Sequence, residues 1–173
     1  FDWSVNKDHL IKNDVTIFMN RSQKHNGNIK YTLLPNYTGR IILNYSISAQ
    51  DLNYFDGNEK VEIYLEEIDK GFDLDQRLVW LETKTNNNLS IATAATIIIE
   101  SASKPKYKLE FNQENLLANV ELTLDVKKDI EYNVYILGSI YTSKDSEYPI
   151  KDAKENCLEN KDLGWLNLFK ANK

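Results

Sequence analysis

Strict alternation of apolar and polar residues constrains the fold of this chain more than any other feature of its sequence. In the stretch ANVELTLDV, residues 118–126, the apolar residues Val120, Leu122, Leu124 and Val126 are each separated by one polar residue. Successive side chains of a β-strand point to opposite faces. The stretch is therefore predicted to be a strand with one buried face.

The same period-2 pattern recurs along the first 145 residues. Further strands are predicted at 29–34, 40–46, 77–85, 89–100, 107–111 and 131–143. Residues 86–88 are three asparagines between two of these strands, and they suit a hairpin turn because Asn tolerates positive φ. Residues 97–99 are apolar on both faces, as expected for a strand deep inside a sandwich. Short strands with regular turn signals indicate an antiparallel β-sandwich, which we expect to fill residues 1–147.

The period changes from 2 to about 3.6 in residues 148–173. Ala153, Cys157 and Leu158 fall on one helical face. A second set of residues on one face comprises Leu163, Leu166 and Phe169. Gly164 weakens the second helix near its start. We therefore predict a short C-terminal helical segment that leaves the sandwich, and its large apolar side chains need cover from the sandwich or from a following domain.

Composition argues against several classes of function. The net charge is −5, which disfavours a nucleic-acid or anionic-membrane surface. The longest apolar run is far shorter than the roughly 20 residues of a membrane span, and no signal peptide is visible. Cys157 is the only cysteine, so no internal disulfide is possible. Because the chain begins at Phe1, we expect it to be a piece of a longer product or to have lost residues upstream.

The residues that commonly bind metals or phosphates form no recognised pattern. The two histidines, His9 and His25, have no cysteine or further histidine at zinc-ligand spacing. Residues 51–59 resemble a calcium loop, but such a loop needs an oxygen ligand and then a glycine where this chain has Phe55 and Asp56. The six glycines form no phosphate-binding loop. We therefore predict no metal site and no cofactor.

Carboxylates and aromatic residues are plentiful, but neither forms a catalytic arrangement. Several carboxylates lie in one charged stretch: Glu62, Glu66, Glu67, Asp69 and Asp73. Glycoside chemistry needs two opposed carboxyl groups, one of them with a raised pKa, and nothing apolar surrounds these. We interpret them as a solvated face. Most of the ten tyrosines and three tryptophans fall on alternating strand positions, which favours core packing over a sugar-stacking platform.

Four N-x-S/T motifs are candidate glycosylation sites if the protein is secreted through a eukaryotic route. Their acceptors are Asn20, Asn36, Asn44 and Asn88. The chain is rich in asparagine, so these motifs also arise by chance.

Three segments, read together, resemble the N-terminal β-sandwich of glycoside hydrolase family 65, which holds maltose, trehalose, kojibiose and nigerose phosphorylases and acid trehalases. The first, residues 25–53, carries His25, Ile29, Tyr31 and a turn with Gly39. The other two are LETKTNNNLSIATAATIIIE, residues 81–100, and residues 140–173 with Gly164-Trp165 near the end. The sequence SAQDLN departs from the family, whose second strand usually ends in LDG.

The resemblance implies a non-catalytic part of an enzyme that cleaves α-glucosidic disaccharides with inversion, by phosphorolysis or hydrolysis. In that family the catalytic acid and the phosphate-binding residues belong to an (α/α)6 barrel further along the chain. No position here matches them, so no catalytic residue is assigned. The implied partners are that barrel, the remainder of the sandwich and, through the parent enzyme, the disaccharide and phosphate. A bacterial phosphorylase would be cytoplasmic, and an acid trehalase would be secreted or vacuolar.

The family resemblance also implies that this chain is the second half of the sandwich followed by the first linker helices. Half a sandwich would leave an unpaired strand edge and an uncovered apolar face. The alternative is a free-standing β-sandwich that binds carbohydrate or protein through exposed aromatic residues. A linker would dock Trp165, Leu166 and Phe169 on other protein, whereas a free-standing module would fold them back on itself.

Overall fold

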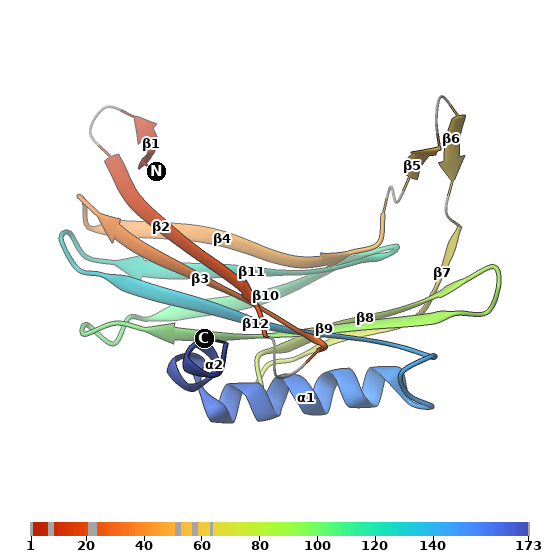
Figure 1. The fold of residues 1–173 in the computed structure, drawn as a ribbon. Helices are drawn as coiled ribbons and strands as arrows, with labels where there is room; N and C mark the ends of the chain where they lie inside the picture. The colour runs from red at the N-terminus through yellow and green to blue at the C-terminus, as the bar shows by residue number, and fades with distance from the viewer. Residues whose placement is uncertain are drawn as a thin grey trace.

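The computed structural model describes residues 2–6, 9–20, 24–50, 53–56, 59–62 and 64–172. A seven-stranded sheet faces a three-stranded sheet, and two helices cover the outer side of the larger one (Figure 1). All strand pairs are antiparallel. This confirms the predicted fold class, a mainly β antiparallel sandwich with a short C-terminal helical segment.

The larger sheet consists of β1 (Asp2–Asn6), β2 (His9–Met19), β3 (Asn26–Pro35), β7 (Leu65–Asp73), β8 (Leu78–Thr85), β9 (Ser90–Glu100) and β12 (Tyr132–Thr142). Their order in space is β1-β2-β3-β12-β9-β8-β7. The last strand of the chain, β12, thus lies at the centre of the sheet, between β3 and β9.

The smaller sheet consists of β4 (Gly39–Ser48), β10 (Tyr107–Glu114) and β11 (Leu117–Val126), in the order β10-β11-β4. A separate hairpin, β5 (Asn53–Asp56) and β6 (Glu59–Glu62), projects from the connection between β4 and β7 (Figure 1). In the described part of the chain, both β4 and β10 pair on one side only, so each is an edge strand.

The turn after β3 carries the chain from the larger sheet to the smaller one. Pro35 ends β3, and Gly39 begins β4. Asn36 holds the turn against the start of β2, because its backbone N–H donates to the Leu10 oxygen at 3.0 Å and its Oδ1 accepts from the Leu10 N–H at 2.8 Å. The predicted strand, turn and strand of residues 29–46 are therefore confirmed, and each strand belongs to a different sheet.

The alternating stretch of residues 118–126 forms most of β11 and lies at the centre of the main core. Val120, Leu122 and Leu124 are fully buried and face the larger sheet. Each such side chain stabilises the fold by about 1.5–3 kcal/mol relative to an exposed position. Glu121 and Thr123 point to the opposite side, as predicted.

Strand β9 is buried on both faces, but the second face is covered by helix rather than by a sheet. Ile97 packs into the core between the sheets, while Ala92 and Ala94 pack under the first helix. The continuous buried run is residues 94–97, and Ile98 and Ile99 are only half-buried. The two-sided burial expected for residues 97–99 therefore begins earlier in the strand than predicted.

Helices α1 (Pro149–Leu163) and α2 (Trp165–Ala171) fold back on the outer face of the larger sheet. Ala153 and Cys157 are fully buried there, which confirms the predicted face of α1. The expectation that this segment leaves the sandwich is wrong over the described residues, because Ala153, Cys157 and Leu168 are all covered by the sheet. No helix in the described ranges has the length and apolar character needed to cross a membrane.

The predicted apolar face of the second helix is right for Phe169 and wrong for Leu163 and Leu166. Leu163 and Leu166 are exposed, and the residues that pack on the sheet are Trp165, Leu168 and Phe169. The cause is Gly164, whose φ of +75° and ψ of 155° end α1 and start α2 in a new direction. A face extrapolated from α1 is therefore out of phase in α2.

Candidate functional site

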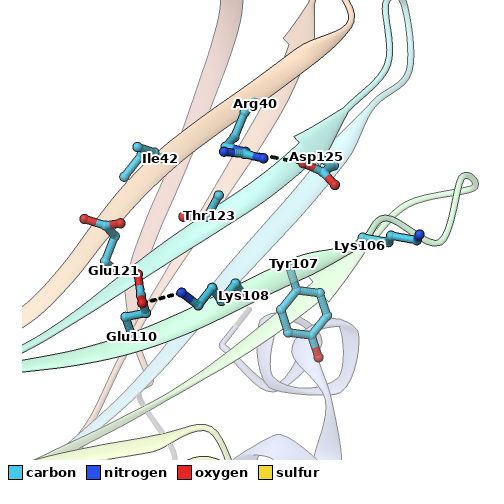
Figure 2. A pocket seen from close by; sticks show the side chains of 9 residues that line it. All are labelled: Arg40, Ile42, Lys106, Tyr107, Lys108, Glu110, Glu121, Thr123 and Asp125. Atoms are coloured by element: carbon cyan, nitrogen blue, oxygen red, sulfur yellow. Dashed lines mark hydrogen bonds and ion pairs between the residues drawn. The ribbon is translucent and has the colours of Figure 1, made fainter.

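A hollow of about 420 Å³ lies on the outer face of the smaller sheet (Figure 2). It is lined by Arg40, Ile42, Lys106, Tyr107, Lys108, Glu110, Glu121, Thr123 and Asp125. These residues come from β4, β11, β10 and the segment before β10. The polar positions of the alternating strands therefore form its floor.

The register of the three strands places these side chains in rows. Thr123 of β11 is opposite Lys108 of β10 and Ile42 of β4. In the next row, Asp125 is opposite Arg40. The side chains of these rows stand on one open surface of the sheet (Figure 2).

The charges in the hollow balance. The basic residues are Arg40, Lys106 and Lys108, and the acidic residues are Glu110, Glu121 and Asp125. Arg40 Nε lies 3.6 Å from Asp125 Oδ1, and Lys108 pairs with Glu110. Both ion pairs are exposed, so each contributes about 0–1 kcal/mol. This balance favours a neutral polar ligand or the polar rim of a protein contact over a strongly charged ligand.

The carboxylates of this hollow do not form a glycosidase pair. Glu110 and Glu121 are directly opposite each other in the β10–β11 ladder. Glu110 is exposed and paired with Lys108, and Glu121 is half-buried on the same open face. An acid that protonates a glycosidic oxygen needs an apolar environment that raises its pKa, and this face provides none.

Tyr107 is the aromatic residue that lines the hollow, and it is partly exposed. The guanidinium carbon of Arg77 lies 5.1 Å from the centroid of its ring. Tyr107 is opposite the buried Leu124 in the β10–β11 ladder, so its ring points away from the face that carries Thr123 and the carboxylates (Figure 2). Among the residues that line the hollow, none offers an aromatic ring on the same face as the polar groups.

A second hollow, of about 440 Å³, lies where the ends of the two sheets meet. Tyr132 is buried beneath it, and its hydroxyl accepts from the Lys127 N–H at 2.8 Å and lies 3.3 Å from Ser103 Oγ. Lys104 and Lys106 stand at its exposed rim. The hydroxyl is thus already engaged by the protein, and the lysines are solvated.

The carboxylates of residues 62–73 were interpreted from the sequence as a solvated face, but several of them accept hydrogen bonds from the protein. Asp69 Oδ2 accepts from Trp80 Nε1 at 2.9 Å. Asp73 Oδ1 accepts from the Gln76 N–H at 2.9 Å. Glu66 is exposed, in agreement with a solvated face, while the side chain of Glu62 lies outside the described residues.

Glu67 joins the edge strand β7 to the tip of the β10–β11 hairpin. Its Oε2 accepts from Lys70 Nζ at 2.8 Å and from the Leu116 N–H at 2.7 Å. Burial alone would raise the pKa of Glu67, but the Lys70 and Leu116 hydrogen bonds and the Lys70 charge together lower it. This carboxylate therefore stabilises the structure as an ion.

The two histidines make unrelated contacts. The ring of His9 lies 4.6 Å from the ring of Tyr37. His25 stacks on Tyr141 at 4.0 Å, and its Nδ1 lies 2.9 Å from the Ile140 oxygen. Among the described residues, no group of three or more His, Cys, Asp or Glu side chains is placed to hold a metal ion. The side chains of the loop at 51–59 lie outside the described residues.

The four sequon asparagines differ in accessibility. Asn36, Asn44 and Asn88 are exposed, and Asn88 has a φ of +65° in the β8–β9 turn, where a left-handed Asn was expected. Asn44 lies on the outer face of β4, opposite Glu121. Asn20 is only 5% exposed, so a glycan could not reach it in the folded chain. The remaining three are accessible positions for the predicted modification.

Sequence reasoning did not identify the hollow of the smaller sheet or the buried asparagines of β3. The hollow has a signal in the sequence, because most of its residues are polar positions of alternating strands. Asn26 and Asn28 have none, since both are fully buried at positions that a pattern of polarity assigns to solvent.

Comparisons with known proteins identify relatives of the fold. The family model described as glycosyl hydrolase family 65, N-terminal domain, matches residues 1–173. A solved structure described as a kojibiose phosphorylase from human microbiome superposes with a TM-score of 0.78 at 13% sequence identity. The match covers 99% of this chain and 21% of that chain. No curated protein matches the sequence.

Proposed function

This chain belongs to glycosyl hydrolase family 65, as its N-terminal domain, and from that premise we propose that it is the non-catalytic scaffold of a disaccharide-cleaving enzyme. The parent protein would act on an α-glucosidic disaccharide with inversion, by phosphorolysis or hydrolysis. Catalysis would reside in an (α/α)6 barrel elsewhere in the parent protein. Residues 148–173 would form the start of the linker toward that barrel.

The observation that carries this proposal is an uncovered apolar strip on the inner face of the larger sheet. Ile17 and Met19 of β2 are 67% and 62% exposed, and Ile140 of β12 is also exposed. The strand register places Ile17 in one row with Ile29, on the face that elsewhere forms the main core. We call Ile17, Met19 and Ile140 the inner strip.

The inner strip is exposed because the two sheets differ in width. Three strands face seven. Where the smaller sheet lies over the larger one, Ile97 and Val134 are buried. Beyond it, the same face meets water. Exposed apolar surface of this kind marks a protein contact, and the remainder of the N-terminal sandwich in the parent protein is the cover that we propose.

The size of the matched enzyme supports the same reading. This chain spans about one fifth of that solved chain, so four fifths of such an enzyme lie outside the matched region. A barrel and additional sandwich strands would account for that length. Phosphorolysis, hydrolysis and the sugar linkage would all be determined by the barrel.

The second candidate function is a free-standing binding module, and one observation favours it. Trp165 and Phe169 fold back on the sandwich, where their rings lie 5.0 and 5.6 Å from the ring of Phe18. A free-standing module would cover these residues in this way. Its ligand would be a neutral sugar or a polar protein segment held on the polar face of the hollow, by residues such as Thr123 and Glu121.

The inner strip can be tested in the parent protein with Ile17→Glu. We expect a charge there to lower the thermal stability and the soluble yield of the parent protein, because it would be buried against the covering polypeptide. The matched control is Ile42→Glu, which places the same charge on the exposed outer face of the smaller sheet. Equal effects of the two substitutions would contradict a covered strip.

The activity is tested by incubating the parent protein with kojibiose, trehalose, maltose and nigerose, with and without phosphate. Glucose 1-phosphate that forms only with phosphate identifies a phosphorylase, and glucose formed without phosphate identifies a hydrolase. A native product that is a 20 kDa monomer, turns over none of these sugars and binds one of them would establish the binding module instead.

A further inference from the structure

Asn28 lies in an apolar row on the outer face of the larger sheet. Its partners in the ladder are Phe18 of β2 on one side and Leu137 of β12 on the other. Phe18 and Leu137 belong to one cluster with Leu168 of α2, and Trp165 packs against that cluster. Asn28 is therefore a polar residue in the surface on which α2 sits.

The amide of Asn28 is buried, and among the described residues it has no hydrogen-bond partner. The residue is 0% exposed, and within the described part of the chain neither Nδ2 nor Oδ1 has a hydrogen-bond partner. A buried polar group without a partner opposes the burial that encloses it. Any motion that admits water to Asn28 therefore recovers the free energy lost when its amide was buried without a partner.

Helix α2 packs on the neighbours of Asn28 with few buried residues. It has seven residues, of which Leu168 alone is fully buried, and it has no side-chain cap at its N-terminus. A helix of this length is unstable away from its packing partner. Its hold on the sheet therefore depends on Leu168 and on the rings of Trp165 and Phe169.

Helix α1 is held much more firmly. It contributes four buried residues to the interface with the sheet, against one from α2. Polar contacts to the sheet and to the β7–β8 loop are spread along α1: Lys154 with Asp69 at 3.7 Å, Asn156 Oδ1 with Ser139 Oγ at 3.1 Å, Cys157 Sγ with the Ala94 oxygen at 3.1 Å and Lys161 Nζ with the Gln76 oxygen at 2.7 Å.

The joint between the helices is Gly164. Its φ of +75° is a conformation that L side chains rarely adopt, and a Cβ placed on it would meet no atom within 4 Å. No neighbouring atom therefore crowds this residue, while its backbone N–H stays bonded to α1, donating to the Asn160 oxygen at 3.0 Å. In the last turn of α1, Asn160 is fully buried and its Oδ1 has no hydrogen-bond partner among the described residues.

We propose that α2 is a latch, which releases from the larger sheet by rotation at Gly164 while α1 remains docked, and that the buried amide of Asn28 makes this release easy. Release brings water to Asn28 and exposes Trp165, Leu168 and Phe169. The released segment is then able to follow whatever the chain connects to after α1. This inference does not depend on the proposed function.

The test is amide hydrogen exchange, measured on the native product that carries this chain. The amides hydrogen-bonded within α2 begin at Leu168, which donates to the Gly164 oxygen. We expect the amides of 168–171 to exchange at least tenfold faster than those of 153–160. Asn28→Val should slow exchange in α2 by about tenfold or more, because it removes the unpaired amide, and should leave α1 unchanged. The matched control is Asn112→Val, at an exposed position of β10, which should alter neither helix.

A second variant tests the independence of the latch. Leu168→Ala should remove protection from α2 while exchange in α1 stays within about twofold of the unmodified protein. Loss of protection in both helices would overturn the proposal, as would equal exchange of the two helices before any substitution. An Asn28→Val protein in which α2 exchanges as before would show that Asn28 does not set the release. One that fails to fold would show that the Asn28 amide stabilises the fold, which would also overturn its proposed role.

Discussion

The ammonium nitrogen of Lys154, on α1, lies 3.5 Å from the centroid of the Trp80 ring on β8. Trp80 also donates to Asp69 on β7, whose Oδ2 lies 3.7 Å from Lys154 Nζ. Burial lowers the pKa of Lys154, and the Asp69 charge opposes that shift. One helix is thus joined to two strands through a single indole ring.

The first prediction concerns the space beneath that ring. Gly71 is directly opposite Trp80 in the β7–β8 ladder, and a Cβ on it would lie 2.5 Å from Cζ2 of the indole. Gly71→Ala must displace the ring from Lys154 and Asp69, so we expect the free energy of unfolding to fall by about 1–3 kcal/mol in urea denaturation. Gly27→Ala is the control, because its Cβ would meet only the flexible end of Met19. Similar losses from the two substitutions would contradict a specific role for the ring.

The second prediction concerns the reactivity of Cys157. This thiol is enclosed between α1 and β9, and burial raises its pKa to about 12. A free thiol has a pKa of about 8.5, so at pH 8 the thiolate fraction of Cys157 is roughly a thousandfold smaller. We expect Ellman's reagent to label it extremely slowly in the folded protein and rapidly in urea. Rapid labelling without denaturant would mean that α1 undocks readily.

The third prediction is a dependence of stability on pH through Glu67. Its pKa is lowered in the folded state, so the ion contributes stability above the ordinary value of 4.5, and this contribution is lost as the pH falls through the lowered pKa. Glu67→Gln should therefore lower the free energy of unfolding by about 1–2 kcal/mol at pH 7. The difference from the unmodified protein should shrink below about pH 4, because protonation removes the same charge.

Urea denaturation at several pH values between 3 and 7 measures this effect. Glu66→Gln, at the exposed neighbouring position, is the control and should leave the curve unchanged. A constant gap between Glu67→Gln and the unmodified protein at every pH would show that the charge of Glu67 is not what stabilises the hairpin tip.

The fourth prediction compares the two faces of β11. Leu122→Asp would bury a charge without a partner in the main core, at a cost of several kcal/mol, which is enough to unfold a domain of ordinary stability. Glu121→Lys, on the outer face, should change stability by less than about 0.5 kcal/mol. Circular dichroism of the two purified variants measures the contrast, and equal losses would mean that both faces of the strand are covered.

The sequence was sufficient to predict the elements whose periodicity is complete. The alternation in residues 118–126 placed Leu122 in the core, and the hairpin between β8 and β9 followed from three consecutive asparagines. Ala153 and Cys157 were assigned to the correct face of α1. In each case the local pattern alone determines which side chains are buried, and contacts with distant parts of the chain do not alter the result.

Other features depend on contacts that no local pattern records. The turn at Asn36 sends β3 and β4 to different sheets, and its sequence would look the same in a hairpin within one sheet. The phase of α2 depends on the backbone angles of Gly164. The burial of Asn28 depends on where α2 lands, since the same residue on an uncovered sheet would be a solvated position.

The central place of β12 in the larger sheet has a consequence for how this protein is made. Ile136 pairs with Ile29 on one side and with Ile97 on the other, so β12 joins the two halves of the sheet. Strand β12 ends at residue 142. Until the ribosome has released it, nothing connects the strands β1, β2 and β3 to the strands β7, β8 and β9 within the sheet. Pairing across such a separation is slow. Synthesis must therefore run nearly to α1 before the first strands are secured, and a pause before β12 would leave them available to chaperones or to the same strands of another nascent copy.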